Sequence, residues 1–340
     1  MRYPLSRDEA ASLVNASLLM DGCPSRLPVW QSCLTPGTQP QEAVLAIGAF
    51  DGVHRGHRAL IAKARADAER RGVPCLAVTF DPDPSELLDC DPQPRLLSVA
   101  DRVQGLRALG VRNVVVLPFT RELANTEPEA FISDVLCALT RPVAIHVGSN
   151  FRFGVRGAGT TALLRQLGPT YGFEVEESPL LVAGGERISS TRIRTFLGEG
   201  GRLDEANQLL GRCHFVRGSV EHGRGEGTSF GFPTANVRCA ELSCMPAEGV
   251  YGGYLRINGR VWPAAINVGA PKSFTDERME RFLEANLIGF EGDVYGAAAE
   301  VIFVSWLRPS RPFASLEELE RVVLGNIDWV RTNLGDGEVG

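Results

Sequence analysis

The sequence predicts an α/β protein of two domains, an N-terminal doubly wound parallel sheet followed by a C-terminal antiparallel β-barrel with a terminal helix. Its 340 residues exceed what a single hydrophobic core usually covers. Up to about residue 211, short apolar runs alternate with segments of helical period. Beyond that point, strand-like runs follow one another without a helix between them. The two halves therefore differ in architecture.

The N-terminal domain is expected to follow an extension, residues 1–42, that ends in the loop-like stretch TPGTQPQ. Four apolar runs rich in β-branched side chains predict its strands, at residues 43–48, 74–80, 112–119 and 143–148. Residues 57–72 and 98–110 have the apolar spacing of helices, and the second begins with a capping pattern of Ser98 and Asp101. This alternation predicts βαβ units, with a ligand site beyond the carboxyl ends of the strands.

The C-terminal domain is predicted from alternating or apolar segments separated by Gly, Asn or Pro. These segments are residues 214–223, 249–257, 260–269, 281–290 and 294–307. A helix is expected only after them, at residues 315–334. Such an order is typical of an antiparallel barrel or sandwich with a helix packed on it. We expect domains at 43–185 and 212–340, joined by linker helices at 186–211.

Composition and charge narrow the class of protein. Hydrophobic residues make up 44% of the chain, enough for a core in each domain, and the net charge of −6 argues against an extended basic surface for nucleic acid or anionic membranes. The eight cysteines form no Cys-x-x-Cys pattern, which favours free thiols in a reducing compartment. No apolar run is long enough for a membrane helix, and the first residues make a poor signal peptide. We expect a cytoplasmic protein without nucleic-acid or membrane partners, and the sequence leaves a homo-oligomer open.

A first candidate site lies in GAFDGVHRGH, residues 48–57, where a strand is expected to meet a helix. The glycines permit a tight turn and close approach of a ligand, and a helix start offers unpaired N–H groups to an anion. His54 and His57 are three residues apart and face the same side of that helix. A single histidine is more often a buried group satisfied by a carbonyl, but a pair in this setting favours a triphosphate site.

A second phosphate-binding segment is ISSTRIR, residues 188–194. Ser189, Ser190 and Thr191 are residue types that begin helices, and their hydroxyls and N–H groups can hold phosphate oxygens. Arg194 lies one turn further and points back toward them. An ordinary capped helix with a surface arginine is the alternative, and it would be favoured without the histidine pair.

These segments resemble the two signatures of the nucleotidyltransferase superfamily, in the form found in the FAD synthetase module of bacterial bifunctional riboflavin kinase/FAD synthetases. VTFDPDPSELL and VGSNFRFGVRGAGT resemble two further segments of that module. The resemblance implies a Rossmann-like fold in which an FMN phosphate oxygen attacks the α-phosphorus of ATP and pyrophosphate leaves. It implies catalytic roles for His54, His57 and Arg194, and further site residues. The implied ATP-binding residues are Gly48, Phe50, His54, His57, Ser190, Thr191 and Arg194, and the implied flavin-binding residues are Asn150 and Phe151.

The N-terminal half departs from the family pattern at two positions. Asp83 stands where the family usually has His, so an anion replaces a neutral or cationic donor near the expected phosphates. Thr160 stands where many members have Asp, which is a milder change.

The downstream segment HGRGEGTSFGFPTANV, residues 222–237, indicates a second candidate site for phosphates and a metal ion. Its glycines could let a loop fold over phosphates, and Thr234 and Asn236 supply hard oxygen ligands suited to Mg²⁺. A hairpin connection explains the same glycines equally well. The spacing matches neither the Walker A loop nor the glycine loop of protein kinases.

This half resembles the riboflavin kinase module, whose G-F-P-T-A-N motif binds the phosphates of Mg·ATP. GVYGGYL, INVGAPKSF and LEANLIGFEGDVYG are similar to its other segments. The resemblance implies that Glu284 is the catalytic base for the riboflavin 5′-hydroxyl. It implies that ATP is bound by Gly223, Gly231, Thr234 and Asn236, and that the metal is bound by Thr234 and Asn236. The implied flavin-binding residues are Asp293 and Tyr295. This half departs from the family pattern at four positions. Thr228 stands where members usually have Arg or Lys, and Arg224 could take over that role. Lys272 and Ser273 stand in place of Pro-Thr, and Ser310 stands in place of Glu.

The resemblance covers about residues 43–335, with several motifs in order. It implies a bifunctional enzyme that phosphorylates riboflavin to FMN and adenylylates FMN to FAD, with ATP and Mg²⁺ (or Mn²⁺) at both sites. Two alternatives follow from the departures. One is an FMN adenylyltransferase whose kinase-like domain only binds flavin, and the other is a flavin-binding or flavin-sensing protein without catalysis.

Overall fold

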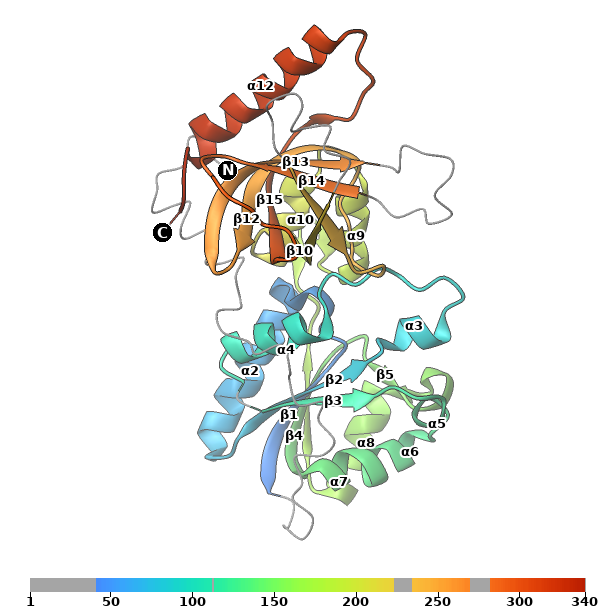
Figure 1. The fold of residues 1–340 in the computed structure, drawn as a ribbon. Helices are drawn as coiled ribbons and strands as arrows, with labels where there is room; N and C mark the ends of the chain where they lie inside the picture. Colours follow the sequence, from blue (N-terminus) through green and yellow to red (C-terminus); the bar gives the residue numbers. More distant parts are fainter. Residues whose placement is uncertain (1–40, 112, 223–233, 270–281, 340) are drawn as a thin grey trace. The chain divides into compact units, whose positions relative to one another are not determined.

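The computed structural model describes residues 41–111, 113–222, 234–269 and 282–339, which form two compact units (Figure 1). The first holds the described residues up to Gln93 together with Leu97–Ser189. The second holds Pro94–Leu96 and the described residues from Ser190 onward. The division at Ser190 falls inside the expected linker, residues 186–211, and assigns the helices of that linker to the second unit.

The first unit is built on a parallel sheet of five strands in the order β3-β2-β1-β4-β7. The strands are β1 (Glu42–Ile47), β2 (Cys75–Asp81), β3 (Asn113–Pro118), β4 (Arg141–Gly148) and β7 (Glu174–Ser178). The helices are α2 (Arg55–Arg71), α3 (Pro84–Leu88), α4 (Val99–Ala108), α5 (Arg121–Ala124), α6 (Pro128–Ala130), a π-helical turn (Phe131–Leu136), α7 (Cys137–Leu139) and α8 (Thr161–Tyr171). Two short hairpins pair β5 (Arg152–Phe153) with β6 (Gly159–Thr160) and β8 (Val182–Ala183) with β9 (Glu186–Arg187).

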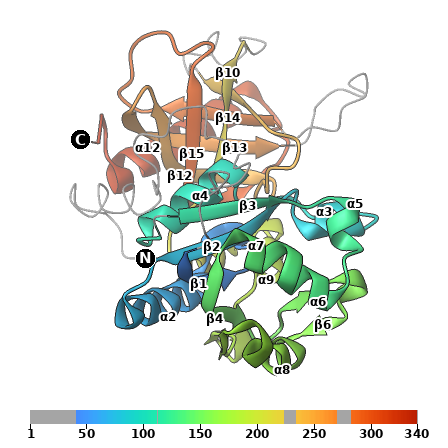
Figure 2. The same ribbon diagram turned by 90° about the horizontal axis from the view of Figure 1, so that it is seen from below.

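Helices cover both faces of this sheet (Figure 2), as the predicted doubly wound fold requires. On one face, alternate strand residues such as Leu45 and Ile145 pack in a core with Ile132 and with Leu164 of α8. α2 contacts β1, β2 and β4, and it buries an apolar stripe that includes Ile61. The capping pattern expected before α4 is confirmed, because the Ser98 hydroxyl accepts the N–H of Asp101 at 3.1 Å. β7 was not predicted, since its sequence EVEES is polar.

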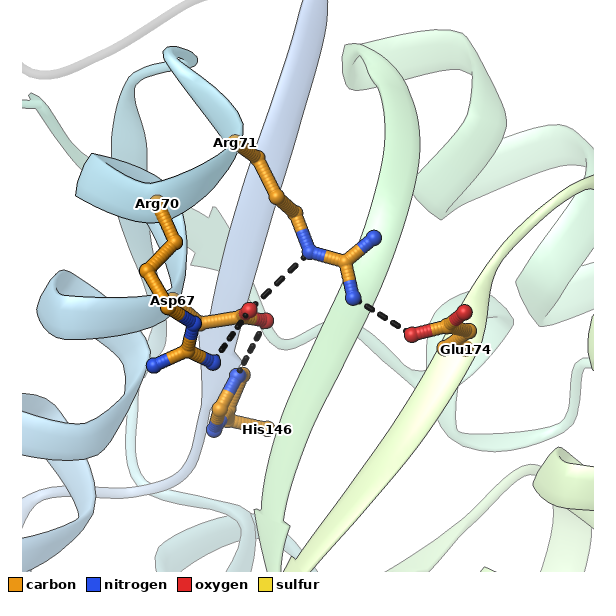
Figure 3. A network of polar contacts seen from close by, with 5 residues as sticks. All are labelled: Asp67, Arg70, Arg71, His146 and Glu174. Carbon is orange, nitrogen blue, oxygen red and sulfur yellow. Dashed lines mark hydrogen bonds and ion pairs between the residues drawn. The ribbon is translucent and has the colours of Figure 1, made fainter.

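A buried carboxylate ties the C-terminal part of α2 to the sheet (Figure 3). The Asp67 side chain, only 3% exposed, lies 3.0 Å from His146 Nε2 on β4. Arg70 and Arg71 also donate to it, at 2.8 and 3.0 Å, and Arg71 reaches Glu174 on β7. Burial alone would raise the pKa of Asp67, but the hydrogen bonds from His146 and Arg71 bring it below its ordinary value. The network therefore joins one helix to two strands.

The second unit is a closed antiparallel barrel in the order β10-β11-β14-β13-β12-β15. Its strands are β10 (His214–Glu221), β11 (Ala235–Cys239), β12 (Gly249–Ile257), β13 (Arg260–Gly269), β14 (Phe282–Leu287) and β15 (Ala298–Pro309). Its helices are α9 (Ser190–Gly198), α10 (Leu203–Leu210) and α12 (Leu316–Leu334). The predicted barrel with a terminal helix is confirmed, while the short strand β11 was not among the expected ones.

Helices pack on the barrel at specific close contacts. α12 lies against β12 and β13, where a side chain on Gly252 would put its Cβ 2.5 Å from the Trp329 ring. α10 contacts β15, and the Asn207 amide of α10 donates to the carbonyl of Phe303 at 3.2 Å while accepting the N–H of His214 at 2.7 Å. These contacts explain why both helices belong to the barrel unit.

We predict that Asp67→Asn destabilises the first unit by about 3 kcal/mol, because removing one partner of a buried charged network leaves the others uncompensated. Hydrogen exchange of the β1 and β4 amides in the full chain would measure this. Because the pKa of Asp67 is lowered in the folded state, its stabilisation is complete above the unfolded value of about 3.9 and fades as the pH falls through the folded value. The difference between variant and wild type should therefore shrink in acid.

Glu69→Gln on the same helix is the control, since Glu69 is 73% exposed and pairs with Arg65 at 3.5 Å. Exposed pairs of this kind contribute about 0.5 kcal/mol or less. Equal effects of the two substitutions would contradict the assignment of Asp67 as an anchor.

Candidate functional site

The turn between β1 and α2 brings the two predicted histidines into contact. His54 is the N-cap of α2, and its Nδ1 accepts the N–H of His57 at 3.3 Å. The two rings stack with centroids 3.6 Å apart, and the Phe50 ring meets His57 edge-on at 5.3 Å. Gly48 lies against the Phe50 ring, and its N–H donates to the carbonyl of Val78 at 3.1 Å. The predicted positions Gly48, Phe50, His54 and His57 thus form one cluster at the carboxyl end of β1.

Burial sets the charge of these histidines. It lowers the pKa of His54 to about 4. Burial, followed by the charges of His54 and Arg102, lowers the pKa of His57 well below its ordinary value. Both rings are therefore neutral at neutral pH. Since Nδ1 of His54 accepts a hydrogen bond, its proton lies on Nε2, which can donate to a phosphate oxygen.

The predicted residues of the second phosphate-binding segment lie on α9, which belongs to the barrel unit. Ser190 is the first residue of the helix and is half-buried, and Thr191 is exposed. Arg194 is half-buried one turn further along, and its Nε donates to the carbonyl of Pro94 at 2.6 Å. The arginine side chain is thus anchored within its own unit.

The predicted flavin residues of the first unit follow β4. Asn150 is exposed in a turn, and Phe151 stacks on Phe153 with ring centroids 5.6 Å apart. The two departures in this unit have structural roles as helix caps. Asp83 caps α3 by accepting the N–H of Ser85 at 3.1 Å. Thr160 caps α8, a role that Asp fills equally well.

In the barrel, three polar side chains lie side by side across neighbouring strands. Glu284 on β14 is directly opposite Asn236 on β11 and, on its other side, opposite Asn267 on β13. Side chains paired in this way have Cβ atoms about 4.5–5.5 Å apart. All three are half-buried, whereas their strand neighbours, such as Leu283 and Ala285, are buried. The row therefore lies on the outer face of the barrel.

Thr234 directly precedes β11 and is half-buried. Because side chains two residues apart share a face in extended chain, Thr234 lies on the side of Asn236. The hydroxyl and amide oxygens of this pair, beside a carboxylate, are a donor set that suits Mg²⁺. Ser310 extends the row, since its hydroxyl lies 3.5 Å from Oδ1 of Asn267.

The predicted flavin residues of the barrel unit lie in the turn before β15. The N–H of Tyr295 is bonded to Oδ1 of Asp293 at 2.9 Å, which folds the turn. The Tyr295 ring is half exposed and stacks on His222 with centroids 3.7 Å apart. Neither His222 nor Asn267 was predicted from the sequence, although both stand inside the segments that resemble the riboflavin kinase module. The remaining positions named from the sequence, Gly223, Arg224, Thr228, Gly231, Lys272 and Ser273, lie outside the described residues.

The first unit has a parallel sheet with two histidines at the start of a helix, and the second is a barrel with a carboxylate between two asparagines. These features define a class of two-domain transferases. The chain matches the FAD synthetase family over residues 37–192 and the riboflavin kinase family over residues 210–334. It is 37% identical to the bifunctional riboflavin kinase/FMN adenylyltransferase of Escherichia coli K12, over 83% of this chain and 90% of that protein. The corresponding Bacillus subtilis protein is 34% identical, over 82% and 88%. The chain belongs to the family of bifunctional riboflavin kinases/FMN adenylyltransferases.

Among solved structures, a macrolide-efflux protein from Streptococcus pneumoniae matches with a TM-score of 0.78 and 29% identity, over 86% of this chain and 95% of that one. The family confirms the predicted enzyme, which forms FMN from riboflavin and FAD from FMN with ATP as co-substrate. It supports this interpretation over the two alternatives drawn from the sequence. No helix in the described part of the chain is both long and apolar enough to cross a membrane.

Gly56→Ala should weaken ATP binding at the histidine turn without weakening the fold. The added Cβ would lie 3.1 Å from Cε1 of His54, so the ring must move. The shift needed is a few tenths of an ångström. A turn of the ring by about 30° off its rotamer costs about 1 kcal/mol, and the same loss in binding free energy is roughly a fivefold rise in KM for ATP in FAD synthesis. Alanine is also the better helix former, so unfolding should not become easier. Steady-state kinetics and a thermal melt would measure the two effects.

Gly325→Ala in α12 is the matched control, because its Cβ would meet nothing within 4 Å. It should leave the KM for ATP unchanged. An unaltered KM in Gly56→Ala would mean that the position of His54 does not matter to the nucleotide.

Proposed function

We propose that the barrel catalyses the phosphorylation of riboflavin and that the unit with the parallel sheet catalyses the adenylylation of FMN. The observation that carries this assignment is the placement of Glu284 directly opposite Asn236 on the outer face of the barrel. It puts a proton acceptor next to the side chain expected to hold the metal and its nucleotide. The histidine turn supplies a separate anion site in the other unit.

In the kinase step, Glu284 accepts the proton of the riboflavin 5′-hydroxyl as that oxygen attacks the γ-phosphorus of ATP. The new O–P bond forms as the bond to the β-phosphate oxygen breaks, and ADP leaves. A carboxylate suits this role because it needs only to accept a proton from a neighbouring hydroxyl. Its half-buried position limits competing water. Asp293 and Tyr295 are the residues we assign to the flavin.

Thr234 and Asn236 would hold Mg²⁺, as their hard oxygens fit this ion. When bound, the ion neutralises part of the phosphate charge that opposes attack. Glu284 remains the residue that removes the proton. We infer the same ion for the adenylyl step, in which it accompanies ATP.

In the adenylyl step, an FMN phosphate oxygen attacks the α-phosphorus of ATP, and pyrophosphate leaves. The attacking oxygen already carries negative charge, so the step needs no general base. His54, His57 and the N–H groups at the start of α2 donate to the phosphates, while Arg194 with Ser190 and Thr191 supplies the charge and hydroxyls of the second segment. Asn150 and Phe151 are the residues we assign to the FMN side.

We further infer that the enzyme acts in the cytoplasm on small molecules alone. Its substrates are a vitamin and a nucleotide, and its net charge of −6 gives it no general attraction for nucleic acid or anionic lipid.

Chromatographic analysis of flavins tests the proposal. Purified protein incubated with riboflavin and Mg·ATP should yield both FMN and FAD, and addition of EDTA should stop both products. FAD formed only when FMN is supplied would indicate an inactive kinase half. Flavin binding without any product would refute catalysis.

Glu284→Gln should lower the rate of FMN formation by a factor of about 10² or more, because the amide cannot accept the proton. FAD synthesis from supplied FMN should stay near the wild-type rate. Conversely, the double variant His57→Ala with Arg194→Ala should lose only FAD synthesis. Loss of both activities in a folded Glu284→Gln protein would contradict the division of labour.

A further inference from the structure

The β1–α2 turn that carries the histidines has an uncommon backbone. Phe50 has φ 53° and Val53 has φ 40°, both in the left-handed region. A β-branched residue such as valine rarely adopts positive φ, because its side chain crowds the backbone there. Both side chains are buried. A turn of this kind persists only where surrounding groups hold it.

Two contacts from outside the turn hold it, one on its backbone and one on a side chain. The hydroxyl of Thr79, at the carboxyl end of β2, donates to the carbonyl of Ala49 at 2.9 Å. The N–H of Leu97 donates to the carboxylate of Asp51 at 3.1 Å. The contact of Thr79 is made on the residue just before Phe50, where the chain enters the left-handed region.

Arg102 fixes the direction of the Thr79 hydroxyl. Arg102 is fully buried on α4, and its Nη1 donates to Thr79 Oγ1 at 3.1 Å and to the carbonyl of Phe80 at 3.0 Å. A guanidinium can only donate and a carbonyl can only accept, whereas a threonine hydroxyl has one hydrogen. Because Thr79 accepts from Arg102, its hydrogen is available to the carbonyl of Ala49. The hydrogen bonds therefore run in one direction, from Arg102 through Thr79 to Ala49.

Burying a guanidinium carries a large desolvation penalty, and an apolar side chain would fill the same space without it. Its charge also acts on the site, since Arg102 contributes, after burial and His54, to the lowered pKa of His57. The residue thus affects the turn through Thr79 and the histidine pair through its charge.

We propose that Arg102 and Thr79 are positioning residues for adenylyl transfer, which hold the β1–α2 turn in the conformation that presents His54 and His57 to the ATP phosphates. Neither residue touches the substrate in this proposal. It rests on the proposed function of the histidine turn. It gives a role to Thr79, which stands inside the quoted segment VTFDPDPSELL without one, and adds Arg102 of α4, which lies in none of the quoted motifs.

The test compares threonine variants in the full-length enzyme. Thr79→Val keeps the shape of the side chain but removes the hydroxyl, and Thr79→Ser keeps the hydroxyl. Thr140→Val is the matched control, because Thr140 is also buried in the first unit and its hydroxyl also donates to a backbone carbonyl, that of Gln41. Both valine variants lose one buried hydrogen bond, but only one loses it at the turn.

We expect the KM for ATP in FAD synthesis to rise about tenfold in Thr79→Val, because misplaced donors bind the phosphates less well. Thr79→Ser should stay within about threefold of wild type, and Thr140→Val should leave this KM unchanged. KM does not depend on the fraction of folded enzyme, so a purely structural role would not change it. FMN formation from riboflavin in the same preparation serves as an internal reference and should be unaffected.

Equal KM values for ATP in Thr79→Val and Thr140→Val would overturn the role of Thr79. For Arg102, we compare Arg102→Met with Arg102→Lys, which keeps a charged donor. The Met variant should raise the KM more than the Lys variant, and wild-type KM values in both would overturn the role of Arg102. The proposed function fails separately, if wild type makes no FAD or if His57→Ala keeps full FAD synthesis.

Discussion

The register of β14 between β11 and β13 is the constraint on which the chemistry of the barrel depends. Leu283 and Ala285 are buried, and they hold the strand in a pairing that leaves Glu284 on the outer face. A slip of one residue would exchange the two faces and bury an ionised carboxylate, which is strongly unfavourable without a partner. The apolar pattern that builds the core therefore also sets the geometry of the polar row proposed for catalysis. Asn236 and Asn267 take their places from the same pattern.

The two sites handle polyphosphates by different physical means. In the proposed kinase step the barrel uses side chains on adjacent strands, and a carboxylate suits this step because a neutral hydroxyl must lose its proton. In the proposed adenylyl step the first unit uses backbone N–H groups at the start of α2 with two neutral imidazoles, and the attacking group is already an anion. Each unit therefore carries the groups that its own reaction needs.

Much of the fold could be predicted from the sequence, because apolar periodicity is a local property that β1, β4, β12 and β13 display clearly. The histidine turn could also be predicted, because the chain has only five histidines and two of them stand three residues apart among glycines. β7 was missed because four of its five residues are partly or fully exposed and its sequence is polar. Arg102 and Asn267 were not recognised because their importance comes from partners distant in sequence, Thr79 for one and Glu284 for the other. Only the folded chain brings these pairs together.

The anchoring of α2 by Asp67 also affects the opposite end of that helix. Asp67 lies ten residues after His57, about 15 Å along the helix axis at 1.5 Å per residue. A helix fastened to β4 and β7 at one end and closed by its own cap at the other cannot slide along the sheet when an anion arrives. If the nucleotide binds at the first turn of α2 as proposed, the donors there are already oriented, so little configurational freedom is lost on association. The contacts at its two ends thus fix the position of α2 against the sheet.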